Sequence, residues 1–372
     1  MMTGALDGIV VADFSRVLAG PYATMMMGDL GAEVVKVERP GTGDDTRSWG
    51  PPYLPADENT DPMATYFASV NRNKTSLVVD LQTEDGREQA RDLVRRSDVV
   101  IENFRAGTME RLGLGYDTLV AEKPDLIYCA ITGFGRDDGA DIPGYDLLIQ
   151  AMSGLMSITG PDGSPSKVGV AVVDVLTGVH AVAGILAALR HRDRTGEGQR
   201  VDLNLFMVAL SSMANMTTAY LGADVVPRSM GNRHPSIVPY EVFSTADRPL
   251  ALAVGNDTQF ARLATALGVP DLVDDERYAT NTARVAHRDD LVAELTEKLR
   301  HEGADHWYQV LTRAGVPAGP INDIAEAFTF ARSIGIEPAV DVEGTDIPAV
   351  GNPIGMSLTP ATYRLPPPVL PT

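Results

Sequence analysis

The chain has 372 residues, of which 44% are hydrophobic, and it carries a formal net charge of −19 at pH 7. This length provides one large hydrophobic core or two moderate ones. The acidic balance argues against nucleic acid or an anionic membrane surface as the main partner, because both require a basic footprint on the protein.

Cysteine usage and the N-terminus bear on the cellular compartment. Cys129 is the single cysteine, so no internal disulfide can form, and its apolar surroundings predict a buried structural thiol. The N-terminus lacks the basic start and long apolar stretch of a signal peptide, and no uninterrupted run of 18 apolar residues follows. We therefore expect a soluble, cytoplasmic protein.

The first two hundred residues alternate short β-branched runs with helical patterns. Strands are predicted over residues 8–14, 32–38, 75–81, 98–104 and 125–135, and helices over 20–31, 83–97 and 106–113. This order is typical of an α/β fold, in which a mostly parallel sheet is covered by helices on both faces. Ligands of such sheets gather at the carboxyl ends of the strands.

The character of the chain changes near Asp224, where turn-forming residues precede a strand and a helical set over 257–268, 281–302 and 303–315. The final forty residues return to short strand-like pieces, and the proline-rich tail at 365–372 is expected to be extended. We therefore predict a large domain over 1–200, a linker over 201–225, a small α+β domain over 226–325, and a return segment over 326–372.

Several common kinds of site lack their motifs. No G-x-G-x-x-G follows the first strand and no G-x-x-x-x-G-K-[ST] occurs, so nicotinamide dinucleotides and P-loop nucleotides lose support. The six histidines are scattered and form no H-E-x-x-H motif, so we predict no metal site. No G-x-S-x-G elbow occurs either, which leaves a Ser-His-Asp hydrolase unsupported.

One carboxylate, Asp174, stands out because it lies between two apolar stretches, Val168–Val173 and a helical pattern that runs to about Leu189. An aspartate in front of a helix is usually an N-cap. A partly desolvated carboxylate at a helix start can also serve as a nucleophile or a general base. Spacing alone leaves both interpretations open.

Basic residues recur beside the predicted strands. Singly, each is best explained as a solvated surface charge; together, they could line a cleft for phosphates. The residues concerned are Arg39, Arg72, Lys74, Arg105 and Arg111.

These motifs, read in order, resemble the class III CoA-transferases. The segments that carry the resemblance are "GIVVADFSRVLAGPYATMMMGDLGAEVVKVERPGTGDDTR", "NRNKTSLVVDL", "VVIENFRAGTMERLGLGY", "PGYDLLIQAMSG" and "RTGEGQRVDLNLF". The resemblance runs from about Gly8 to about Pro367, and it is to the CaiB/BaiF family, which also includes α-methylacyl-CoA racemases. It implies a Rossmann-like large domain, a smaller α+β domain, and an intertwined, interlocked-ring homodimer.

The resemblance also implies the site. Asp174 falls on the nucleophilic aspartate, and coenzyme A or acyl-CoA is a substrate, with no tightly bound cofactor. The reaction would pass CoA from an acyl-CoA donor to a carboxylic acid through an aspartyl anhydride and an aspartyl-CoA thioester. The CoA-contacting positions correspond to Val17, Leu18, Ala19, Arg39, Asn71, Arg72, Asn73, Lys74, Glu102, Asn103, Phe104, Arg111, Tyr145 and Asp146.

Two departures from the family patterns bear on specificity. The racemase branch places a histidine before the aspartate where this chain has Tyr145, and a tyrosine is a poor base at neutral pH. This disfavours the alternative activity, an acyl-CoA racemase or epimerase. The oxalate-specific branch carries a glutamine where this chain has Leu18.

Four residues of the predicted small domain are further candidates for contact with the acceptor acid. Arg233 and His234 could approach it from a partner subunit, although a turn with solvated charges explains them equally well. Gly255 and Asn256 lie at a strand-to-helix turn that a plain helix cap would also explain.

Overall fold

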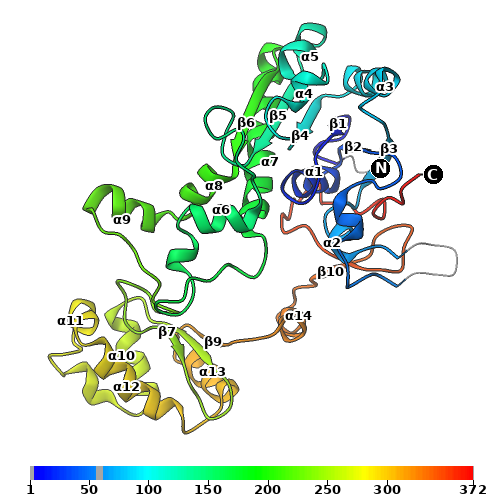
Figure 1. Ribbon diagram of the computed structural model, residues 1–372. Helices are drawn as coiled ribbons and strands as arrows, with labels where there is room; N and C mark the ends of the chain where they lie inside the picture. The colour runs from blue at the N-terminus through cyan, green and yellow to red at the C-terminus, as the bar shows by residue number, and fades with distance from the viewer. Residues whose placement is uncertain (1–3, 56–61, 372) are drawn as a thin grey trace. The chain divides into compact units, whose positions relative to one another are not determined.

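The computed structural model describes residues 4–55 and 62–371, which fall into two compact units (Figure 1). The first unit comprises the chain up to Met156, Lys167–Val226 and the segment from Glu337 onward. The second comprises Ser157–Ser166 and Pro227–Ile336.

A six-stranded parallel sheet forms the centre of the first unit. Its strands lie in the order β3-β2-β1-β4-β5-β6, so the direction of winding reverses between β1 and β4. The strands are β1 (Val10–Asp13), β2 (Glu33–Glu38), β3 (Lys74–Val78), β4 (Val99–Glu102), β5 (Ile127–Thr132) and β6 (Gln199–Asn204). In a sheet of this order, ligands bind outside the carboxyl ends of the strands at the reversal.

Apolar side chains alternate along these strands and build a core on each face. On β4, Val99 and Ile101 pack with α1 (Ala19–Asp29), α7 (Val172–Thr195) and α8 (Leu205–Ser212), whereas Val100 packs on the opposite face. That face is covered by α3 (Glu84–Arg95), α4 (Thr108–Arg111) and α5 (Tyr116–Glu122). The prediction of a parallel sheet with helices on both faces is confirmed.

Shorter elements complete the first unit. They are the 3-10 helix η1 (Asp45–Ser48), the helices α2 (Thr65–Ala68), α6 (Asp146–Met152) and α9 (Asn215–Ala223), and the antiparallel pair β10 (Ala339–Val340) and β11 (Ala349–Val350). The 3-10 helix η2 (Met156–Ile158) begins at the last residue of this stretch of the first unit and continues into the second unit. Residues 201–225, which we interpreted as a linker, contain the end of β6 together with α8 and α9.

The second unit is α+β. A three-stranded antiparallel sheet, β7 (Tyr240–Phe243), β8 (Leu250–Ala253) and β9 (Ala318–Pro320), shares a core with the helices that follow β8. These are α10 (Asp257–Ala266), η3 (Pro270–Val273), α11 (Asn281–Ala286), α12 (Arg288–Leu299) and α13 (Ala304–Arg313), and α14 (Ile324–Ser333) follows β9. The helix predicted over 281–302 is two helices that meet at His287.

The helix α7 is long and apolar enough to cross a bilayer by length and composition. In this chain it packs against α1, α8, β5 and β6. Val173, Ala181, Ile185 and Leu189 are buried along it, so α7 is a helix of the core. Cys129, on the neighbouring β5, is fully buried as predicted, and burial raises the pKa of its thiol far above the usual range.

Candidate active site

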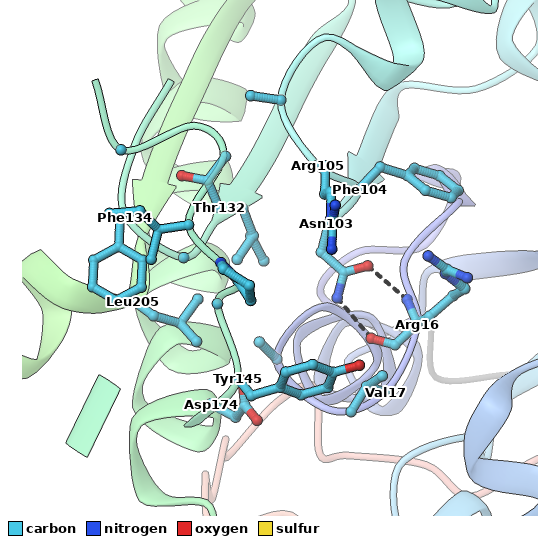
Figure 2. A pocket seen from close by; sticks show the side chains of 18 of the residues that line it. Arg16, Val17, Asn103, Phe104, Arg105, Thr132, Phe134, Tyr145, Asp174 and Leu205 are labelled. Carbon is cyan, nitrogen blue, oxygen red and sulfur yellow. Dashed lines mark hydrogen bonds between the residues drawn. The ribbon is translucent and has the colours of Figure 1, made fainter. Parts of the chain in front are cut away.

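A pocket of about 210 Å³ lies where the winding of the sheet reverses (Figure 2). Its walls are the segments that follow β1, β4 and β5, and the start of α7 contributes Asp174. The lining residues are Arg16–Ala19, Asp45, Asn103–Ala106, Ile131–Gly135, Gly139, Ala140, Ile142–Tyr145, Asp174 and Leu205. Three stretches far apart in sequence thus meet at one edge of the sheet.

The turn between β1 and α1 has an unusual backbone. Val17 has a φ of 68°, in the left-handed region that β-branched residues rarely adopt. The side chain of Asn103 binds both backbone polar groups of Arg16, the residue before Val17. It accepts from Arg16 N at 2.8 Å and donates to Arg16 O at 2.7 Å (Figure 2). A further contact joins Val17 N to the buried carboxylate of Asp44 at 3.3 Å. The pocket wall is therefore fixed from two directions.

The segment that follows β4 makes a cation–π contact with the segment that follows β1. The guanidinium of Arg16 lies over the ring of Phe104, 4.8 Å from its centroid. Asp45 pairs with Arg16 at 3.7 Å and also with Arg39, whose Nε donates to Thr42 at 2.6 Å. Arg16 and Asp45 were not singled out from the sequence; only the position of Arg16 directly after a strand could have indicated it.

Asp174 is the third residue of α7, which begins at Val172 with Ala171 as its N-cap residue. The interpretation of Asp174 as the N-cap is therefore wrong. Among the residues that the structure describes, none donates a hydrogen bond to its half-buried carboxylate. Burial, and secondarily the nearby charge of Asp146, raises the pKa of Asp174 to about 7. An unpaired carboxylate with a raised pKa in a pocket is typical of a functional group.

Two tyrosines lie near this carboxylate. Tyr66 of α2 packs into a small cluster with Leu18 and Val175. Burial, and then the charges of Asp174, Asp146 and Asp44, raise its pKa to about 12, so the phenol keeps its proton at neutral pH. Tyr145 is 63% exposed, and Figure 2 shows its ring beside Asp174 in the pocket.

Seven of the residues predicted from the resemblance come together in the pocket. They are Val17, Leu18, Ala19, Asn103, Phe104, Tyr145 and Asp174. Glu102 lies just behind them: its carboxylate accepts from Phe104 N at 2.8 Å, and burial raises its pKa to about 7. Arg111 is exposed and donates to Thr108 at 2.9 Å.

The predicted segment Asn71–Lys74 does not line the pocket, and its side chains are buried and bonded within the protein. Arg72 forms a two-pronged ion pair with Asp29, at 2.9 and 2.6 Å. Lys74 donates to Asp13, Pro21 O and Asn71 Oδ1 at 2.9–3.1 Å. These contacts occupy the donors that the sequence interpretation had assigned to phosphates.

The four candidates in the second unit have local roles there. Asn256 caps α10 by accepting from Gln259 N at 2.9 Å, and Gly255 N donates to the Gln259 side chain at 2.7 Å. Arg233 pairs with Glu241 and Asp289 at 3.6 and 3.5 Å. His234 accepts from Ser236 N at 3.1 Å. The cap interpretation of Asn256 is confirmed, and contact of these residues with an acceptor stays a prediction.

The fold and the site define a class of α/β enzyme. Its doubly wound sheet forms a pocket where the winding reverses, and the unpaired carboxylate of Asp174 lines this pocket. The sequence profile of CoA-transferase family III matches residues 6–371, and the chain belongs to this family. It is an acyl-CoA:carboxylate CoA-transferase.

Individual relatives agree with this assignment. The succinate–glutarate CoA-transferase of Agrobacterium fabrum is 49% identical, over 98% of this chain and 92% of its own. The succinyl-CoA:glutarate CoA-transferase of Mus musculus is 44% identical, over 88% of this chain and 74% of its own. A solved CAIB/BAIF family protein from Brucella suis matches with a TM-score of 0.88 and 43% identity, over 99% of this chain and 97% of its own.

Proposed function

We propose that this enzyme transfers CoA between short dicarboxylic acids through covalent intermediates on Asp174. The observation that carries the proposal is the Asp174 carboxylate, half-buried in the pocket and without a hydrogen-bond donor among the described residues. A carboxylate that is already desolvated and unpaired has no bonds to give up before it attacks a carbonyl carbon.

The reaction proceeds in four acyl-transfer steps. The Asp174 carboxylate attacks the donor thioester, which gives an aspartyl anhydride and CoA thiolate. The thiolate attacks the aspartyl carbonyl, which gives aspartyl-CoA thioester and releases the donor acid. The acceptor carboxylate then attacks this thioester, which gives a second aspartyl anhydride and releases CoA thiolate. The thiolate attacks the acceptor's carbonyl in this anhydride and displaces the Asp174 carboxylate. The products are acceptor-CoA and free Asp174, with no net change of protons.

The substrate class rests on the relatives, two of which are named for transfer between succinate and glutarate. Racemisation is disfavoured because Tyr145, in the pocket beside Asp174, stands where the racemase branch has a histidine.

We further propose that the active protein is the interlocked homodimer that the family resemblance implies. Large apolar side chains stand exposed on α9 and just after it, where a monomer would leave them in water. These are Tyr220, Leu221, Val225 and Val226. Sedimentation analysis of the purified protein checks the proposal: twice the chain mass supports it, and a monomer that retains full activity contradicts it.

The test of function compares wild type with Asp174→Ala and Asp174→Asn. Each protein is incubated with succinyl-CoA and a panel of free acids (glutarate, mesaconate, oxalate, acetate), and CoA redistribution is followed by mass spectrometry. We expect wild type to favour the dicarboxylates and both variants to lose at least about 10³-fold in rate. Borohydride should trap the aspartyl-CoA thioester in wild type alone.

A matched control is Asp193→Asn, an exposed carboxylate near the other end of α7, which should retain wild-type activity. Equal transfer by wild type and both Asp174 variants would show that the nucleophile is elsewhere. Deuterium incorporation at the α carbon without CoA exchange would instead support the racemase.

A further inference from the structure

The resemblance assigned Asp146 to contact with CoA, but the structure gives its carboxylate other partners. It is the first residue of α6, and its Oδ1 accepts from the backbone N–H groups of Val173 at 2.9 Å and Asp174 at 3.3 Å. The N-cap residue of α7, Ala171, has no side chain that can do this. A carboxylate from another helix therefore caps α7 at the turn that carries Asp174.

The second oxygen of Asp146 is held as well. Gln150, one turn further along α6 and fully buried, donates from Nε2 to Asp146 Oδ2 at 2.5 Å. Its own Oε1 accepts from Val168 N at 2.9 Å, in the segment that leads into α7. Because both oxygens are engaged inside the protein, Asp146 has little capacity left to bind CoA.

The charge of Asp146 also acts on Asp174. The two carboxylates are close enough that Asp146 disfavours ionisation of Asp174 and adds to the effect of burial. Tyr145, Tyr66 and Tyr22 are other titratable groups near this turn, and Arg16, Asp45 and Arg105 line the same pocket. Among these groups, Asp146 is the one whose charge raises the pKa of Asp174.

We propose that Asp146 is a positioning residue for Asp174: it caps the first turn of α7, fixes the nucleophile's backbone, and places a second carboxylate beside the nucleophile. This inference rests on the proposed role of Asp174 as nucleophile. A more basic carboxylate is the better nucleophile when it is ionised.

Two substitutions distinguish the capping hydrogen bonds of Asp146 from its negative charge. Asp146→Asn keeps an oxygen for the two N–H groups but removes the charge, so the acid limb of the kcat/KM profile should move about one unit below its wild-type midpoint near pH 7. Asp146→Ala removes both, and kcat should fall roughly tenfold or more. For both variants we expect the donor KM to stay within about twofold of wild type. Thermal unfolding verifies that each variant is folded.

Asp117→Asn is the matched control, because Asp117 lies in the first turn of α5 but is exposed and outside the pocket. A tenfold rise in donor KM for Asp146→Asn, with kcat and the pH midpoint unchanged, would identify Asp146 as a CoA ligand and overturn the proposal. If Asp174→Ala retains transfer activity, the proposed function itself fails. If Asp174→Ala is inactive while the Asp146→Asn profile matches wild type, the inference alone fails.

Discussion

Asp174 is a half-buried carboxylate without a hydrogen-bond donor among the described residues, and its folded-state pKa of about 7 lies above the ordinary 3.8. Below pH 3.8 the group is protonated in both the folded and the unfolded chain. As pH rises towards 7, the unfolded chain loses this proton first, so the folded state is progressively destabilised. Above pH 7 the loss is complete.

Replacing Asp174 by asparagine should therefore increase stability at alkaline pH while abolishing transfer. We expect the Asp174→Asn variant to be about 1–3 kcal/mol more stable than wild type at pH 8 and about equal at pH 4. The expected difference in unfolding free energy is smaller than it would be for a fully buried carboxylate, because solvent reaches the Asp174 side chain. Urea unfolding at both pH values measures the difference. A variant no more stable than wild type at pH 8 would show that Asp174 finds a partner in solution.

At the level of elements, the turn that joins β1 to α1 carries the strain of the site. Val17 stays in the left-handed region because Asn103 and Asp44 hold the backbone around it. The first turn of α1 is also close to this segment: a Cβ on Gly20 would lie 2.2 Å from Ser15 Cβ. Strain of this kind persists only where surrounding contacts enforce it, and it occurs often at functional sites.

This strain predicts an inverted order of two substitutions at position 17. Val17→Gly should be more stable than Val17→Ala by about 1–2 kcal/mol, because glycine adopts the left-handed conformation without steric cost. At the exposed helical residue Gln89 of α3 the order should reverse, with alanine about 1 kcal/mol better than glycine. Denaturant unfolding of the four variants provides the comparison. The same order at both positions would show that the turn is unstrained.

Over the whole molecule, the last segment returns to the first unit and is anchored there by Asn73. The Asn73 side chain donates to Thr362 O and to Asp29, both at 2.8 Å. It also accepts from Arg364 N at 2.7 Å and Leu365 N at 3.1 Å. Asn73, which the resemblance assigned to CoA contact, therefore joins the segment near the C-terminus to the N-terminal part of the first unit.

We expect Asn73→Ala to lower the free energy of unfolding by about 3–5 kcal/mol, because four hydrogen bonds are lost and alanine is strained at a φ of 60°. The donor KM should remain near the wild-type value. Asn73→Gly removes the same bonds without the strain, so it should be less destabilised. A variant of normal stability with a much higher donor KM would contradict this structural role.

Much of the first unit was predictable from local pattern. The alternation of β-branched runs with helices determined the strands and their parallel arrangement, because a helix that connects two strands of one sheet returns the chain to the same end of the sheet. The break at His287 was missed because the helical periodicity continues across it. The extent of the second unit was also missed, since Ser157–Ser166 joins it from a distant part of the sequence.

The sequence by itself determined the family, the class of reaction and the aspartate at the start of α7, because these depend on ordered motifs and on one carboxylate in an apolar context. Only the tertiary structure decided which polar residues are available to a ligand. Lys74 and Arg72 are residues of the kind that bind phosphates, yet they already form ion pairs with Asp13 and Asp29. Asp146 and Asp174 are neighbours because α6 packs against α7. Sequence specifies the donors and acceptors, whereas packing determines which of them are already paired.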